Sequence, residues 1–99
     1  MQTHSITLGM NIPNAGSVTN QMWIDFLNVT VLASLEYATI TDSVGIYKGT
    51  LEKSKTISVT TEDPAAVEAR RKVGAAYKAA FNQDAIMYTV TNVPILQFT

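Results

Sequence analysis

The sequence contains no cysteine and only one histidine, His4. Without cysteine the chain can form neither disulfides nor thiolate metal sites, and no redox role follows. A single imidazole also rules out a multi-histidine metal site or a histidine-based nucleophile pair built from one chain. We therefore expect no metal and no cofactor. The lack of cysteine is compatible with a reducing cytosol, and we expect a cytoplasmic protein.

Charge is scarce as well. Charged residues make up 15% of the 99 residues, and 7 Lys or Arg stand against 8 Asp or Glu for a formal net charge of −1. An average soluble domain has about 25% charged residues. No basic stripe interleaved with aromatic residues is present, which argues against a nucleic-acid partner. Hydrophobic residues reach 46%, so we expect some of this apolar surface to lie in a subunit interface.

Long apolar runs and glycine-rich loops are also missing. No run approaches the roughly 18 apolar residues of a membrane-spanning helix, and residues 1–5 have no basic cluster leading into an apolar segment. We expect no membrane partner and no targeting segment. The five glycines are scattered singly, which leaves no phosphate-binding loop. The length suits one core, and we expect residues 1–99 to form a single domain.

The N-terminal third reads as a strand followed by a helix. Apolar residues alternate over residues 5–12 (Ile6, Leu8, Met10 and Ile12), which predicts a half-buried strand. Residues 13–16 have turn chemistry, and Ser17 or Thr19 can cap the helix that follows. We expect that helix to end near Ala33 and to carry residues at three- and four-residue spacing, namely Met22, Trp23, Phe26, Leu27 and Thr30.

The middle of the chain reads as a hairpin. Residues 35–48 are rich in β-branched and aromatic residues but are interrupted at residues 41–43, so they form either one long strand with a bulge or two short pieces. Gly49 and Thr50 then turn the chain. Residues 54–61 alternate in part and predict the antiparallel partner.

A second helix is the clearest element of the sequence. Asp63 can cap it, and Pro64 suits its first position. Small and apolar residues recur at helical spacing from Ala66 to Phe81, and we expect Glu68, Arg70, Arg71 and Lys72 to face water. Residues 82–84 close the helix and residues 85–90 predict a fourth strand, while residues 94–98 could add a short edge strand or a tail packed on a neighbour.

The resulting order, β-α-β-β-α-β, is that of the split βαβ or ferredoxin-like fold, an α+β sandwich with both helices on one face of an antiparallel sheet. The other face must then meet water or a partner. Because the chain carries so few charges, we expect oligomerisation, with residues from different subunits lining a shared pocket.

Three residues at strand ends are candidate functional residues, because the sequence contains neither a carboxylate pair with catalytic spacing nor a phosphate-binding loop. Tyr47 ends a strand, Glu52 begins the next, and Gln83 precedes the last, with Asp84 beside it. Each also has an ordinary interpretation, as a strand aromatic, a solvated turn residue and a helix C-terminal cap. His4, close to the N-terminus, is expected to be exposed.

Three short motifs occur in a characteristic order. They are Gly-Ile-Tyr-Lys at residues 45–48, Glu-Lys-Ser at residues 52–54 and Asn-Gln-Asp-Ala-Ile-Met-Tyr at residues 82–88, with an alanine-rich helix before the last. In this order they resemble the phage-encoded S-adenosylmethionine-cleaving enzymes, formerly called hydrolases and now regarded as lyases. The resemblance covers residues 45–88.

The resemblance implies a homotrimer of ferredoxin-like subunits that binds S-adenosylmethionine at the subunit interfaces. The reaction it implies yields 5′-methylthioadenosine and homoserine lactone, as the substrate carboxylate displaces the thioether. Glu52 and Tyr47 would be the catalytic residues, and Gln83 and Asp84 would bind substrate. Such an enzyme would act in the host cytoplasm, deplete the methyl donor and have an anti-restriction role.

Two other interpretations remain open at the level of sequence. A non-catalytic oligomeric module could hold a small nucleotide-like ligand at the same interfaces, and an assembly protein could use an apolar sheet face only to join subunits. A second resemblance, to small bacterial lipoprotein domains of similar strand and helix order, covers the same half of the chain. It implies an exported protein and no particular activity.

Overall fold

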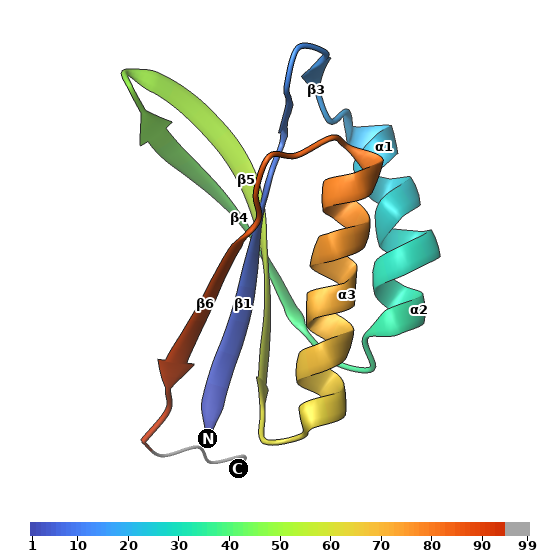
Figure 1. Ribbon diagram of the computed structural model, residues 1–99, viewed down its shortest axis with the longest axis vertical. Helices are drawn as coiled ribbons and strands as arrows, with labels where there is room; N and C mark the ends of the chain where they lie inside the picture. Colours follow the sequence, from blue (N-terminus) through green and yellow to red (C-terminus); the bar gives the residue numbers. More distant parts are fainter. Residues whose placement is uncertain (95–99) are drawn as a thin grey trace.

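A four-stranded antiparallel sheet organises the chain (Figure 1). The structure, a computed structural model, describes residues 1–94. The strands stand in the order β4-β5-β1-β6, and their bounds are Gln2–Gly9 for β1, Thr39–Tyr47 for β4, Thr50–Thr61 for β5 and Met87–Asn92 for β6. The chain leaves β1 through one helical segment to reach β4, and leaves β5 through a second to reach β6. This is the predicted split βαβ topology.

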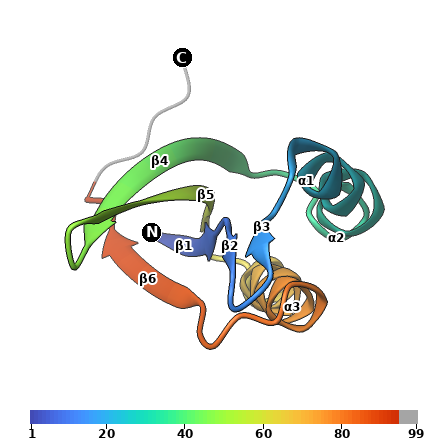
Figure 2. The same cartoon turned by 90° about the horizontal axis from the view of Figure 1, so that it is seen from above.

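Both helical segments cover the same face of the sheet (Figure 2). The first is a continuous run of α1 (Asn20–Phe26), the π-helical turn η1 (Leu27–Val31) and α2 (Leu32–Ser34). Thr19 caps it by accepting a hydrogen bond from the Met22 amide at 3.1 Å. The run ends within a residue of the predicted position. The π turn was not predicted. Of the residues at helical spacing, Trp23 and Phe26 are buried, whereas Met22 is 42% exposed.

The second helix, α3, spans Pro64–Ala80 as its sequence signals predict. The Asp63 side chain accepts from the Ala65 amide at 2.9 Å and so caps the start. At the other end Asn82 takes a left-handed conformation with φ of 51°, and the Gln83 amide donates to the Lys78 carbonyl at 3.0 Å. This bond from the residue after the left-handed position is the Schellman arrangement, which satisfies a carbonyl that the helix leaves free.

The core lies between the sheet and the helices. Ile6, Leu8 and Ile57 point from the sheet into an aromatic cluster on the helices. Within that cluster the rings of Phe26 and Tyr77 meet edge to face, with centroids 5.3 Å apart. The buried Tyr77 hydroxyl donates to the Gly9 carbonyl at the end of β1. Burial raises the pKa of Tyr77 to about 12.

Arg70 contradicts the prediction that it faces water. Its side chain is only 5% exposed. The guanidinium donates from Nη1 to the Ser5 carbonyl at 3.1 Å and lies 4.9 Å from the centre of the Tyr88 ring. Desolvation lowers the pKa of Arg70. The reason is helical spacing: position 70 lies three residues before the buried Val73, on the face that α3 turns to the sheet.

The boundaries of all four sheet strands differ from the predictions. β4 begins at Thr39 rather than at residue 35, and β5 begins at Thr50, four residues earlier than predicted. β1 begins at Gln2 and ends at Gly9, after which the chain enters a separate hairpin of β2 (Asn11–Ile12) and β3 (Gly16–Ser17). β4 runs without interruption, because residues 41–43 pair one to one with β5. β6 lies two residues later than predicted. The predicted segment at residues 94–98 lies, beyond Pro94, outside the described residues.

The uncovered face of the sheet is polar, contrary to the apolar face that the assembly interpretation supposes. Hydroxyls pair across β1 and β5, as Thr3 with Thr60 at 2.7 Å and Ser5 with Ser58 at 2.8 Å. Exposed apolar residues are found mainly on the β4–β5 hairpin, on the first helical run and on β6. The apolar surface anticipated for a subunit contact therefore lies on those elements.

Within residues 1–94, no helix has both the length and the hydropathy needed to cross a membrane. Across the same residues, no cluster of three or more histidine, aspartate or glutamate side chains could hold a metal ion.

Candidate functional site

A cavity of about 250 Å³ opens where β1 ends. Three stretches of chain line it: residues 9–13, the start of β5 and residues 83–85. Glu52, Gln83 and Asp84, three of the four residues singled out in the sequence, are all among its lining residues. Gln83 and Asp84 are neighbours in the sequence, but Glu52 precedes them by about thirty residues, so only the fold brings it to them.

The unequal lengths of neighbouring strands create this cavity. β1 pairs with β5 only as far as Gly9, which lies opposite Ser54. Beyond that point the Met10 amide still donates to the Lys53 carbonyl at 2.9 Å, but the chain then departs into the β2–β3 hairpin. β5 extends further, so Glu52 pairs with Gly45 of β4 and has no β1 residue beside it. The loop from α3 to β6 approaches the part of β5 that β1 no longer covers.

Gln83 is held in place by its own side chain. Its Nε2 donates to the Asn11 carbonyl at 2.8 Å and to the Phe81 carbonyl at 3.2 Å. Its Oε1 accepts no hydrogen bond from the described part of the chain. Oε1 packs against Gly9, where an added Cβ would lie 3.4 Å away. The helix-capping interpretation therefore holds for the Gln83 backbone, while its side-chain oxygen remains available as an acceptor.

Tyr47 is the last residue of β4, and its backbone pairs with Thr50 across the hairpin turn. The turn has two residues, Lys48 and Gly49, both with positive φ, at 51° and 76°. Two-residue turns of this kind match the twist of the strands. Tyr47 and Glu52 consequently belong to the same hairpin, on either side of its tip.

The charges around the cavity are mixed. Glu52 and Asp84 supply carboxylates, and Lys53 supplies an ammonium group. All three residues are exposed, and none makes an ion pair with another described residue. Such a set can bind a ligand that carries both an ammonium and a carboxylate, as an α-amino acid does. Lys53 was not singled out from the sequence, although it stands inside the Glu-Lys-Ser motif.

A larger cavity adjoins this one. Its volume is about 630 Å³, and Met10, Asn11 and Lys53 line both cavities. The rest of its wall comes from β4, β5 and the entry to α1. The two cavities therefore lie beside each other, with the hydrogen-bonded Met10 and Lys53 backbones among the residues that they share.

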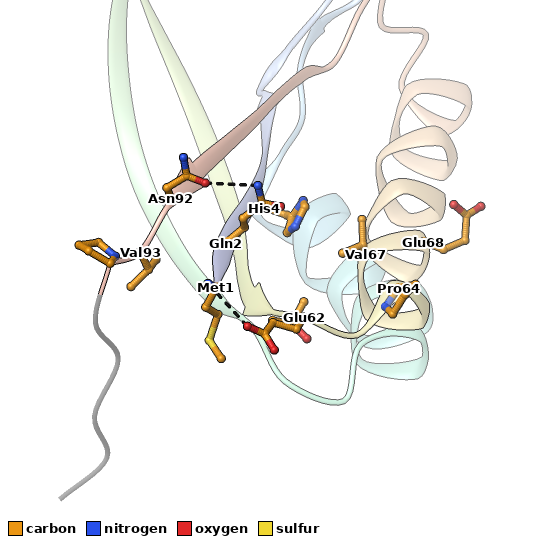
Figure 3. A pocket seen from close by; sticks show the side chains of 11 residues that line it. Met1, Gln2, His4, Glu62, Pro64, Val67, Glu68, Asn92 and Val93 are labelled. Atoms are coloured by element: carbon orange, nitrogen blue, oxygen red, sulfur yellow. Dashed lines mark hydrogen bonds and ion pairs between the residues drawn. The ribbon is translucent and has the colours of Figure 1, made fainter.

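A third cavity, of about 830 Å³, lies near the opposite end of β1 (Figure 3). The His4 ring extends into it from β1 toward Val67 of α3, and Gln2 donates to Asn92 at 3.3 Å along its edge (Figure 3). His4 is half-buried rather than exposed as predicted, and its Nδ1 is buried without a partner among the described residues. None of the four residues singled out in the sequence lines this cavity.

Comparison with known proteins gives a family match, and two phage SAM lyases are among the solved structures that are similar. The family described as "Protein of unknown function (DUF3574)" matches residues 3–96. A phage SAM lyase in complex with S-methyl-5′-thioadenosine has a TM-score of 0.64 at 16% identity, over 91% of this chain and 79% of that one. A phage SAM lyase in the apo state has a TM-score of 0.64 at 18% identity, over 91% and 78%. At such identities the likeness shows a shared fold. No curated protein matches the sequence significantly.

Proposed function

The chain belongs to the family of proteins of unknown function DUF3574, and we propose that it is a lyase that cleaves S-adenosylmethionine. The products would be 5′-methylthioadenosine and homoserine lactone. The observation that carries this proposal is the convergence of Glu52, Gln83 and Asp84 on one cavity, in a fold shared with phage SAM lyases. The mixed charges of that cavity, with Lys53 among them, suit the zwitterionic end of the substrate.

The reaction requires no catalytic base from the protein, because the nucleophile and the leaving group both belong to the substrate. A carboxylate oxygen of the substrate attacks its own γ-carbon and forms the ring C–O bond, while the bond from that carbon to sulfur breaks. The electron pair goes to sulfur, which changes from a sulfonium to a neutral thioether, and no proton has to move. Holding the chain bent so that oxygen faces carbon is a proximity effect, and such effects contribute up to about 7–11 kcal/mol in intramolecular reactions.

Each site residue has a distinct part in this proposal. Glu52 would bind the substrate ammonium and thereby aim the carboxylate. Gln83 would accept a hydrogen bond through Oε1, the one polar atom of its amide that the fold leaves unused, and Asp84 would assist beside it. Tyr47 would pack against or hydrogen-bond the sulfonium end, where an aromatic face can attract a cation.

A homotrimer belongs to the same proposal. The charged cavity residues Glu52, Lys53 and Asp84 are exposed in one chain, whereas opposite charges that cancel during reaction are favoured by a drier site. A neighbouring subunit would close the cavity and exclude water. The large apolar side chains that stay exposed support such a contact, with Ile46 at 78% and Val29 at 75%. S-adenosylmethionine is an intracellular methyl donor, so the proposal requires the protein to act in the cytoplasm.

Incubation of the purified protein with S-adenosylmethionine, followed by chromatography with mass detection, tests the proposal. We expect 5′-methylthioadenosine and homoserine lactone to accumulate with the wild-type protein and not with Glu52→Gln. Binding without product would instead identify a module that sequesters the ligand. Neither binding nor product would overturn both interpretations.

A further inference from the structure

The larger cavity beside the candidate site has no assigned occupant. We infer that it is the nucleoside subsite, which takes the adenosine arm of the substrate while the methionine arm lies in the smaller cavity. The inference rests on the proposed function. It assigns residues outside the three sequence motifs to ligand binding, chiefly Asn11, Asn20, Val44 and Leu51.

The sizes and the shared wall of the two cavities fit a substrate with two arms. The cavities measure about 630 and 250 Å³ and share Met10, Asn11 and Lys53 as lining residues. In S-adenosylmethionine the adenosyl and methionyl groups diverge from one sulfur, and the adenosyl group is the larger. If the sulfur lies at the shared residues, the smaller, zwitterionic arm can lie in the cavity of Glu52 and the adenosyl arm can lie in the larger cavity beside β4 and β5.

Exposed aliphatic side chains form one wall of the larger cavity. Val44 is 61% exposed and Leu51 is 69% exposed. Val44 pairs with Lys53 and Leu51 pairs with Ile46, so the two are diagonal neighbours on one face of the hairpin. A flat purine ring laid on them would remove apolar surface from water on both partners. The floor is apolar too, since the buried Val18 and the half-buried Met10 also line this cavity.

Two asparagine side chains can form hydrogen bonds with the edge of the adenine ring. Asn11 and Asn20 are among the residues that line the cavity, and their side chains make no hydrogen bond to any other described residue. An Asn amide offers one acceptor and two donor hydrogens, which match the amino group and ring nitrogen on one edge of adenine. Hypoxanthine has a carbonyl oxygen in place of that amino group and would lose part of the match.

The larger cavity also contains a carboxylate that could bind the ribose, that of Asp42. Asp42 lines the cavity and accepts an ion pair from Lys55 through Oδ1. Its Oδ2 makes no hydrogen bond or ion pair with the residues described. Carboxylate oxygens are acceptors for hydroxyl groups, so Asp42 can bind a ribose diol.

The test compares 5′-methylthioadenosine with 5′-methylthioinosine by isothermal titration calorimetry, since neither ligand can be cleaved by the proposed reaction. We expect the wild-type protein to prefer the adenine ligand at least about tenfold, and Asn11→Ala and Asn20→Ala each to shrink that preference, because a bidentate amide contact to adenine is worth about 1–3 kcal/mol of discrimination. The double variant Val44→Ser, Leu51→Ser should weaken both ligands about equally. Asn92→Ala, an exposed amide at the opposite end of β1, is the matched control and should bind as wild type does.

The outcomes separate this inference from the proposed function. Wild-type affinity in Asn11→Ala, Asn20→Ala and the aliphatic double variant, in a protein that cleaves S-adenosylmethionine, would overturn the subsite and leave the lyase standing. The expected losses in a protein that does not cleave S-adenosylmethionine would uphold the subsite and overturn the lyase. A wild-type protein that binds neither nucleoside would overturn the subsite.

Discussion

Gln83 reaches across the end of β1 and donates from Nε2 to the carbonyl oxygen of Asn11 at 2.8 Å. This bond ties the loop after α3 to the segment where the chain leaves the sheet. The bond also uses a donor hydrogen of the Gln83 side-chain amide. The oxygen of that amide, Oε1, packs against Gly9 beside the cavity. One side chain thus sets the shape of the candidate site and can contribute an acceptor to it.

We expect Gln83→Ala to lower both stability and substrate affinity. Losing the bond to Asn11 should cost about 1 kcal/mol of unfolding free energy, and losing the acceptor should raise KM. Chemical denaturation and steady-state kinetics measure the two effects. Gln21→Ala is the control, because the Gln21 side chain bonds only Asp25 on the surface of α1. A Gln83→Ala protein with wild-type stability and KM would remove Gln83 from the account.

Glu52→Gln should nearly abolish turnover without unfolding the protein. The side chain is exposed and bonds no other residue within the described range, so the fold does not depend on it. Loss of one charged hydrogen bond to the substrate ammonium lowers the rate by about 10- to 100-fold, and misaiming the carboxylate lowers it further. Kinetics and thermal melting of the same preparation check this. Full activity of the folded variant would contradict the role of Glu52.

Lys53→Met should raise KM more than it lowers kcat, by roughly tenfold for one hydrogen bond to a charged group. The reason is that Lys53 is the one cationic side chain among the residues that line the smaller cavity, where it can bind the substrate carboxylate. Decarboxylated S-adenosylmethionine lacks that group, so its inhibition constant should not change. Lys72→Met, on the exposed side of α3, is the control. Equal losses for the two ligands would show that Lys53 does not recognise the carboxylate.

The raised pKa of Tyr77 predicts that the protein becomes less stable at alkaline pH. Its folded pKa is raised to about 12 from the ordinary 10.0 because burial disfavours the phenolate. Below pH 10 both states are protonated and the stabilisation is fully present. From pH 10 to 12 only the unfolded state ionises, and stability falls by about 1.4 kcal/mol per pH unit. Urea melts of wild type and Tyr77→Phe across this range isolate the effect, since the difference between them should shrink as pH rises. A constant difference would contradict it.

Much of the fold could be predicted from local patterns. The alternation of Ile6 and Leu8 indicates a strand, because both side chains pack against the helices. Asp63 followed by Pro64 indicates the start of a helix, because Asp63 caps the first turn and Pro64 suits its first position. Arg70 was missed because a charged residue was assumed to face water. Its spacing from Val73 and Tyr77 already placed it on the buried face.

The site was only partly accessible from sequence. Motif order singled out Glu52, Gln83 and Asp84, and the structure places all three on one cavity. The cavity itself exists because β5 continues past the end of β1. Such an offset depends on which strands pair, and no local pattern records it. Lys53, Asn11 and Asn20 escaped notice for the same reason, since isolated polar residues acquire meaning only from their neighbours in space.

The most direct test of the central claim is the reaction with S-adenosylmethionine in water labelled with oxygen-18. Attack by the substrate carboxylate predicts homoserine lactone without label, and any homoserine formed by later opening of the lactone should carry the label in its carboxyl group. Label in the hydroxyl oxygen of homoserine would show that water attacks the γ-carbon, and unchanged S-adenosylmethionine would show that the protein is not a lyase.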